Sequence, residues 1–260
     1  IEKHKMDIGE IFITLDSHHK KHIAHQAFWS DMENDVAGKG KKPELFSQIK
    51  NEDLVKGKWF PRDCSLQEYC LKYTNRLEKA GRFTLTIWPD HCLIGSDGHA
   101  IHEEIQKAVR EWDIFHYTKT VKHIHKGMNC LTEMYSAIQA EVPIPSDPNT
   151  TKNTELLQEL EKSGRLFVCG QALSHCVNFT VRDIVKHFKE NNVTTDRIFI
   201  LKDGAAPVAT YEADGEQFLK DMEAEGCTIT TLDEAFNGWK GASGPAKLRS
   251  AVEDIAATHI

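Results

Sequence analysis

Cys176 has both the residue type and the setting of a nucleophile. It follows the strand-like run at residues 166–168 and begins a run with apolar residues at helical spacing. A thiol at such a turn faces the unpaired N–H groups of the helix start, which favour the thiolate. Because the thiolate is the nucleophilic form, we predict covalent chemistry at Cys176. The alternative is a buried structural cysteine.

Asp16, His18 and His91 are candidate metal ligands. Asp16 and His18 stand two residues apart after a hydrophobic strand, so both can project toward one side. A carboxylate and an imidazole begin a divalent metal site, which needs a third ligand from elsewhere. His91 follows Pro89, which ends another strand, in a turn that could offer this ligand. Each segment alone also fits a solvent-exposed loop.

Lys126 follows an alternating strand and precedes a glycine, so its ammonium group could point into a cleft. Near a thiol it would stabilise the thiolate and a developing oxyanion. An isolated lysine is more often a solvated surface group. We assign His123 and His125 to the pleat of the strand, without a catalytic role.

Strand-like and helix-like segments alternate along the chain. We expect strands at residues 10–15, 83–87, 120–124, 165–168, 197–201 and 227–231. Helical spacing predicts helices at residues 66–77, 105–115, 153–162, 177–188 and 216–225, the first with a capping box of Ser65 and Glu68. This order predicts a three-layer α/β fold, with a mainly parallel central sheet and helices on both faces. Sites in such folds lie beyond the carboxyl ends of the strands.

Two segments depart from this alternation of strands and helices. Residues 29–81, rich in lysine and glycine, are interpreted as an insertion in a domain spanning residues 1–240. A surface elaboration is favoured over a lid on the site. Residues 241–260 are predicted to form a tail with a short helix.

Composition excludes several classes of protein. A net charge of −7 and a pI near 6.1 argue against a nucleic-acid partner. No apolar run approaches a membrane span, and the first residues lack a signal-peptide pattern, so we expect a cytosolic protein with no membrane partner. The seven scattered cysteines include no C-x-x-C pair, which favours reduced thiols. We also expect a homo-oligomer.

Together these residues resemble the isochorismatase-like cysteine hydrolases, the superfamily that contains the nicotinamidases. Residues 16–22 match the family's D-x-H-x-x-x-H turn, and residues 88–92 its W-P-x-H-C motif. The lysine segment, the nucleophile motif and the motif beyond the next strand are matched by residues 125–137, 170–177 and 202–206. The resemblance runs in order from about residue 8 to 236, apart from the insertion.

The resemblance implies a Cys–Asp–Lys triad in which Cys176 is the nucleophile and Lys126 the activating cation. The backbone N–H groups of Ala172 and Cys176 would form the oxyanion hole, and the peptide between Gln171 and Ala172 would be cis. Asp16, His18 and His91 would hold zinc or a similar divalent metal. Trp88 could stack on an aromatic substrate.

Two features depart from the family pattern. The triad aspartate normally ends a first strand in a D-x-Q motif, and no such motif precedes Asp16. Since Asp16 would be occupied by the metal, we expect no carboxylate beside Lys126 from the motifs present, and a first strand with that aspartate ahead of residue 1. Ser17 stands where nicotinamidases usually carry tryptophan.

We therefore expect a cysteine amidohydrolase that cleaves a small-molecule amide through a thioester. Hydrolysis of nicotinamide to nicotinate and ammonia is the best specific interpretation. An N-carbamoyl amide or a ureide is an alternative substrate, and a catalytically inactive binding protein of the same fold is the alternative from another class.

Overall fold

The computed structural model describes residues 1–237, so the predicted tail helix lies outside the described residues. The chain divides into two compact units. Among the described residues, the smaller contains Ile1–Ile13, His102–Lys122, Phe236 and Asn237, and the larger contains Thr14–Ile101 and His123–Ala235. All candidate site residues belong to the larger unit.

The smaller unit is built around helix α3 (Glu103–Phe115), which confirms the predicted helix in this region. Its apolar face buries Val109 and Trp112. The Trp112 indole N–H donates to the carbonyl of Ile8 over 3.0 Å, which ties the helix to the segment before strand β1. The short helix η1 (Glu2–His4) completes this unit.

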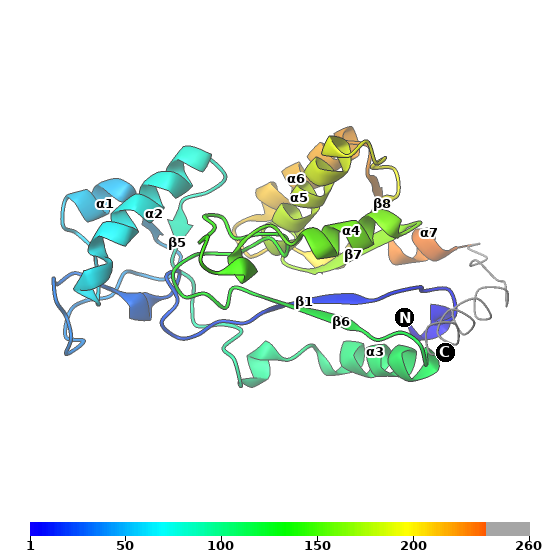
Figure 1. Ribbon diagram of the computed structural model, residues 1–260, viewed down its shortest axis with the longest axis horizontal. Helices are drawn as coiled ribbons and strands as arrows, with labels where there is room; N and C mark the ends of the chain where they lie inside the picture. Colours follow the sequence, from blue (N-terminus) through cyan, green and yellow to red (C-terminus); the bar gives the residue numbers. More distant parts are fainter. Residues whose placement is uncertain (238–260) are drawn as a thin grey trace, which may run out of the picture. The chain divides into compact units, whose positions relative to one another are not determined.

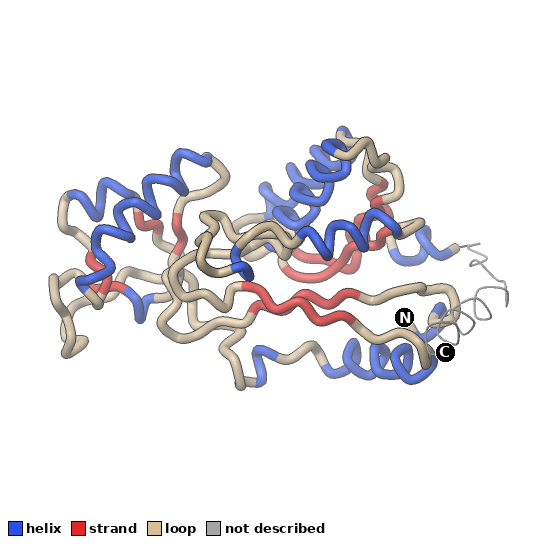
Figure 2. Tube along the Cα trace, in the orientation of Figure 1, coloured by secondary structure: helices blue, strands red, loops and turns tan. Residues whose placement is uncertain are grey.

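Strands β1 (Phe12–Asp16) and β6 (Lys122–Lys126) form a two-stranded sheet, drawn as the central red pair in Figure 2. At their starts the N–H of Lys122 donates to Ile11, and at their ends the N–H of Ser17 donates to Lys126. The strands therefore run in the same direction, and their carboxyl ends meet. Both strands were predicted, with bounds about two residues earlier.

A second, parallel sheet has the order β7–β8–β9 and carries the helix that begins at Cys176. Figure 1 shows α4, α5 and α6 gathered around these strands, with α5 packed on β7. The buried positions of α5 repeat at the predicted helical spacing. The bounds are β7 Leu166–Gln171, β8 Ile198–Ala206, β9 Thr228–Thr230, α4 Thr154–Lys162, α5 Cys176–Glu190 and α6 Glu212–Ala224.

The segment predicted as an insertion has secondary structure of its own. Within it, β2 pairs antiparallel with β4, and two helices are present. Its strand β3 pairs antiparallel with β5, which lies in the strand predicted at residues 83–87. The bounds are β2 Trp29–Ser30, β3 Gln48–Ile49, α1 Asn51–Val55, β4 Phe60–Pro61, η3 Cys64–Leu66, α2 Gln67–Ala80 and β5 Leu85–Thr86. The predicted capping box is wrong, because the Asp63 side chain accepts from the N–H and hydroxyl of Ser65 and caps η3 instead.

This segment also contributes to the hydrophobic core. Trp29, Tyr73 and Leu77 are almost fully buried in one cluster with Trp88 and Tyr135. Two of its hydroxyl groups bind the backbone of the lysine segment. The Tyr69 hydroxyl donates to the carbonyl of Leu131 over 2.7 Å, and that of Tyr73 accepts from the N–H of Glu133 over 3.0 Å.

The remaining described elements are short: η2 (Gln26–Phe28), η4 (Asp97–His99), η5 (Pro148–Thr150) and α7 (Leu232–Phe236). Alternation of helices with parallel strands is the predicted α/β arrangement. Within residues 1–237, no helix is both long enough and apolar enough to cross a membrane.

Candidate active site

The thiol of Cys176 lies beside a lysine and a carboxylate that come from other elements. Its Sγ is 3.3 Å from Nζ of Lys126, the last residue of β6. It is 3.8 Å from Oδ2 of Asp16, the last residue of β1. The pairing of β1 with β6 and the start of α5 therefore bring three groups to one place.

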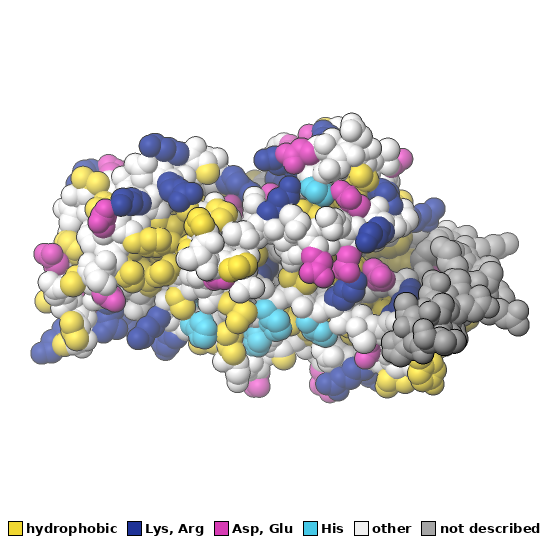
Figure 3. Space-filling model, viewed as in Figure 1, with side chains coloured by type: hydrophobic (Ala, Val, Ile, Leu, Met, Phe, Trp, Pro, Cys, Tyr) yellow, Lys and Arg dark blue, Asp and Glu magenta, His cyan; other side chains and the backbone are white. Residues whose placement is uncertain are grey.

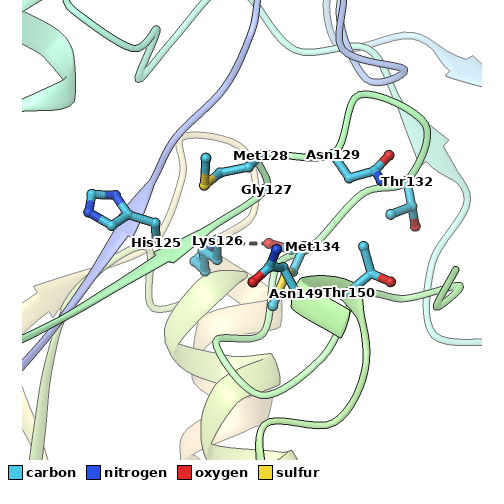
Figure 4. Close-up of a pocket in the computed structure, with 9 residues that line it drawn as sticks. All are labelled: His125, Lys126, Gly127, Met128, Asn129, Thr132, Met134, Asn149 and Thr150. Carbon is cyan, nitrogen blue, oxygen red and sulfur yellow. Dashed lines mark hydrogen bonds between the residues drawn. The ribbon is translucent and has the colours of Figure 1, made fainter. Parts of the chain in front are cut away.

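Lys126 is held by an ion pair and a backbone carbonyl. Its Nζ lies 2.5 Å from Oδ1 of Asp16 and donates to the carbonyl of Met134 over 3.0 Å, the dashed bond in Figure 4. The lysine side chain is only 3% exposed. The prediction that none of the motifs supplies a carboxylate beside Lys126 is wrong. Because β1 pairs with β6, their last residues meet, and Asp16 fills this position.

The charges at the site follow from burial and from this pair. Burial disfavours the charged form of Asp16, but Lys126, His18 and His91 together outweigh burial and lower the pKa of the carboxyl group. Burial likewise opposes the ammonium form of Lys126, but Asp16 and Cys176 together raise its pKa. Burial raises the pKa of the Cys176 thiol to about 12, against the opposing effect of Lys126. Burial thus opposes the thiolate form that the position of Cys176 at the helix start was expected to favour.

Asp16, His18 and His91 come together as the sequence suggested, with their potential ligand atoms within 4.8 Å of one another. Nδ1 of His18 lies 3.0 Å from the carbonyl of Gly127, and Nδ1 of His91 lies 2.8 Å from that of Pro89. A carbonyl only accepts, so both Nδ1 atoms carry the proton and both Nε2 atoms keep a lone pair. Metal-binding histidines are commonly oriented in this way.

The packing around His18 explains two local features. Gly127 has a φ of 70°, and a Cβ at this position would lie 2.5 Å from the His18 ring. A glycine is therefore required directly after Lys126. Burial, followed by the neighbouring His22, lowers the pKa of His18 to about 4, so its ring is neutral near pH 7.

Two further histidines, His22 and His25, pack against this group. Ring centroids are 4.5 Å apart for His18 and His22, and 5.3 Å apart for His25 and His91. Neither was assigned a role from the sequence, although both lie in the loop that follows His18. Figure 3 shows other histidine side chains on the molecular surface. The high histidine content of the chain therefore does not by itself reveal the buried group around His18.

An aromatic cluster lies next to the thiol. Trp88 is 7% exposed, and its indole N–H donates to the Tyr135 hydroxyl over 2.8 Å. The ring of His175, the residue before Cys176, lies 5.1 Å from that of Trp88 and 4.8 Å from that of Tyr211. Only Trp88 was proposed from the sequence. Of the other rings in this cluster, only that of His175 could have been suggested by the sequence, because this residue directly precedes the cysteine.

Comparison with known proteins agrees with this geometry. The chain is 29% identical to the nicotinamidase of Escherichia coli strain K12 over 161 residues, which cover 61% of this chain and 62% of that protein. It superposes on a nicotinamidase/pyrazinamidase of Acinetobacter baumannii with a TM-score of 0.55, at 18% identity over 90% of this chain and 83% of the other. The chain is similar to the E. coli nicotinamidase in sequence and to the A. baumannii enzyme in fold.

The yeast nicotinamidase gives the same result for the fold. Its structure superposes with a TM-score of 0.53, at 17% identity over 86% of this chain and 81% of that chain. The predicted isochorismatase-like α/β fold is therefore confirmed. No known protein-family profile matches the chain. The match spans less than two thirds of the E. coli nicotinamidase.

Within this nicotinamidase-like fold, the predicted oxyanion-hole residues are Ala172, in the turn before α5, and Cys176, the first residue of α5. The peptide between Gln171 and Ala172 is cis. The carbonyl of Ala172 accepts from the N–H groups of His175 and Val177 over 3.0 and 3.1 Å, which closes the turn around Cys176. The N–H of Cys176 lies in the first turn of the helix, where N–H groups have no intrahelical acceptor.

Figure 4 shows a small cavity whose lining includes Lys126, Gly127 and Met134. Its volume of about 10 Å³ has room for about one water molecule and not for an amide substrate. His125 points away from it. Its Nδ1 instead lies 2.9 Å from the hydroxyl of Ser17, which is also 2.8 Å from Nε2 of His99. The serine found in place of tryptophan thus forms polar contacts.

Proposed function

We propose that the protein is a cysteine amidohydrolase that converts a small aromatic amide to its acid and ammonia, with nicotinamide as the first candidate substrate. One observation carries this proposal. The Cys176 thiol lies within 3.3 Å of the Lys126 ammonium and 3.8 Å of the Asp16 carboxylate. The relation to the nicotinamidases and the shared fold support the same chemistry.

Cys176, Asp16 and Lys126 have different roles in the proposed reaction. Asp16 takes the thiol proton as Sγ of Cys176 attacks the amide carbon, and the positive charge of Lys126 stabilises the forming thiolate and oxyanion. The proton passes to the amide nitrogen, the C–N bond breaks and ammonia leaves, which produces a thioester on Cys176. Water then attacks the thioester, and Asp16 again takes a proton. The acid leaves and the thiol is restored.

The remaining groups of the site would orient the substrate. The N–H groups of Ala172 and Cys176 would donate to the oxyanion. Trp88, Tyr135, His175 and Tyr211 provide aromatic rings beside the thiol, which suits a flat heteroaromatic amide. Burial lowers the pKa of His175 to about 4, so this ring is neutral near pH 7.

Asp16, His18 and His91 would hold a divalent metal, with zinc as the first candidate. Two imidazoles whose Nδ1 atoms face backbone carbonyls and one carboxylate form the donor set of a catalytic zinc site. When bound, the ion supplies a Lewis acid that can orient a ring nitrogen of the substrate. Asp16 is shared, since its Oδ1 lies 2.5 Å from Nζ of Lys126 and 3.8 Å from Nε2 of His18.

The test is ammonia release from a panel of small amides, with and without added zinc. The panel contains nicotinamide, an N-carbamoyl amide and a ureide. We expect release from nicotinamide first and none from Cys176→Ala, while Cys64→Ala, which alters an exposed thiol, keeps the activity. Ammonia release from the ureide alone would mean that a ureide is the substrate, and the proposed thiol mechanism would still hold. Release by Cys176→Ala would exclude the thiol as nucleophile.

A further inference from the structure

We propose that His25 is a fourth protein ligand of the divalent ion held by Asp16, His18 and His91. The inference rests on the metal site proposed above and adds to it a residue outside that group. It assigns a ligand of neutral imidazole type that approaches the ion from the loop after His22.

The first observation is that His25 is buried without partners. Its side chain is fully buried, and among residues 1–237 neither ring nitrogen has a hydrogen-bond partner. The backbone of Lys20 lies near the ring and raises the pKa of His25, but this is the smallest of the effects that act on that pKa. Burying an imidazole with both nitrogens unsatisfied is unfavourable, so such a group needs an explanation. A metal ion would supply the missing partner.

The second observation is the spacing of the rings. An imidazole nitrogen binds zinc at about 2.0–2.1 Å, so two imidazoles on one ion have ring centres roughly 5 Å apart. The ring of His25 lies 5.3 Å from that of His91 and 5.4 Å from that of His18, and the latter two are 4.8 Å apart. All three separations agree with rings that surround a common ion.

His22 shows that proximity alone does not select a ligand. Its ring is also buried and lies 4.5 Å from that of His18. However, its Nε2 lies 3.1 Å from the carbonyl of Thr132, and its Nδ1 accepts from the N–H of Ala24 over 3.2 Å. With both nitrogens engaged, His22 supports the loop and has no lone pair to offer. His25 differs from it in this respect.

The ion pair of Asp16 gives a reason for a further ligand. Oδ1 of Asp16 also faces Lys126, which draws negative charge away from a cation. A fourth protein donor would compensate for that loss. A neutral imidazole does so without placing a second anion beside the ion pair.

The test measures metal affinity in the full chain by competition with a chromophoric chelator, using zinc and cobalt(II). The variants are His25→Phe and His25→Gln, which keep a side chain of similar size. His18→Ala serves as a ligand-removing reference, and His19→Ala alters an exposed histidine of the same loop as the matched control. We expect both His25 variants to weaken binding about tenfold or more, because even indirect partners of ligands contribute tenfold to 100-fold. His19→Ala should bind like the unaltered protein.

Two readouts separate a ligand from a packing residue. The cobalt(II) absorption bands should change in the His25 variants, because they report the donor set. The rise in Tm on adding zinc should shrink, while the Tm of the metal-free proteins stays comparable. If His18→Ala loses affinity and both His25 variants keep it with unaltered cobalt bands, the inference about His25 is wrong. Unaltered protein that binds neither ion overturns the whole metal site. Neither result bears on thiol chemistry, which ammonia release tests separately.

Discussion

Lys126 and Asp16 form a buried ion pair, with Nζ 2.5 Å from Oδ1, at the adjoining carboxyl ends of β6 and β1. The pair keeps the ammonium group within 3.3 Å of the Cys176 thiol. A buried charge left without its partner is strongly unfavourable. The same two residues therefore position the reacting groups and influence the stability of the fold.

Replacing Lys126 with methionine should remove activity and lower the free energy of unfolding. The Asp16 carboxylate would remain largely buried without a partner, which costs about 3 kcal/mol. Lys56→Met, at an exposed ion pair, should leave the free energy of unfolding nearly unchanged. Denaturant unfolding measures both. Adding Asp16→Asn to Lys126→Met should restore part of the lost stability, and no recovery would contradict the pairing.

Replacing Asp16 with asparagine should lower the rate of ammonia release by about 100-fold or more, since general base catalysis contributes roughly 10²–10⁴-fold. Asparagine keeps the size of the side chain but cannot take the thiol proton. Asp90→Asn, at an exposed ion pair, is the control and should leave the rate unchanged. Near-normal release by Asp16→Asn would mean that another carboxylate serves Cys176.

That outcome bears on the predicted strand ahead of residue 1, whose D-x-Q aspartate remains a prediction. The structure does not test it. In the described residues β6 pairs only with β1, and β7 only with β8. An aspartate from a further strand would leave Asp16 to the metal. Reading the coding sequence upstream of residue 1 for this motif tests the prediction directly.

The reactivity of Cys176 should rise steeply with pH. Since burial raises the pKa of the thiol to about 12, its thiolate fraction increases tenfold per pH unit between about pH 7 and about pH 9. Alkylation by iodoacetamide, followed by peptide mass spectrometry, should show this rise without a plateau. The exposed Cys64 gives an internal comparison in the same digest. A plateau at Cys176 below about pH 8 would indicate a resting thiolate instead.

Glu141 should make stability depend on pH. Its side chain is 1% exposed, and burial raises its pKa to about 7, despite Arg82 at 3.4 Å. The folded protein thus holds this proton more tightly than the unfolded chain does. The stability that this protonated side chain contributes is complete below about pH 4.5 and is lost as pH rises through about 7, with a size of about 3 kcal/mol.

Comparing Glu141→Gln with the unaltered protein isolates this contribution. The difference in unfolding free energy between the two should change between about pH 5 and about pH 7.5. Glu52→Gln, at an exposed ion pair, should show no such change. A difference that stays constant across this range would show that Glu141 has an ordinary pKa when folded.

The sequence predicted most elements because their signals are local. Apolar residues at helical spacing identified α5 and α3, and Asn153 caps α4, its side chain accepting from the N–H of Leu156. Cys176, Lys126 and the group around His18 were found because each stands beside a recognisable strand end or turn. The homo-oligomer and the cytosolic location stay predictions.

What the sequence did not reveal depends on contacts between distant segments. Asp16 was assigned to the metal alone, because nothing local indicates that β1 pairs with β6 and brings it to Lys126. The contribution of residues 29–81 to the core was hidden by their lysine and glycine content. The missing partners of His25 are visible only once the burial of its ring is known.

The central claim is that Cys176 forms a thioester with an amide substrate. It is tested by mixing the protein with nicotinamide, quenching with acid within the first turnovers and locating any acyl group by peptide mass spectrometry. The account predicts a nicotinoyl group on the peptide containing Cys176, absent from Cys176→Ala, together with ammonia release. Ammonia release with no acyl group on Cys176, and at the same rate in Cys176→Ala, would contradict it.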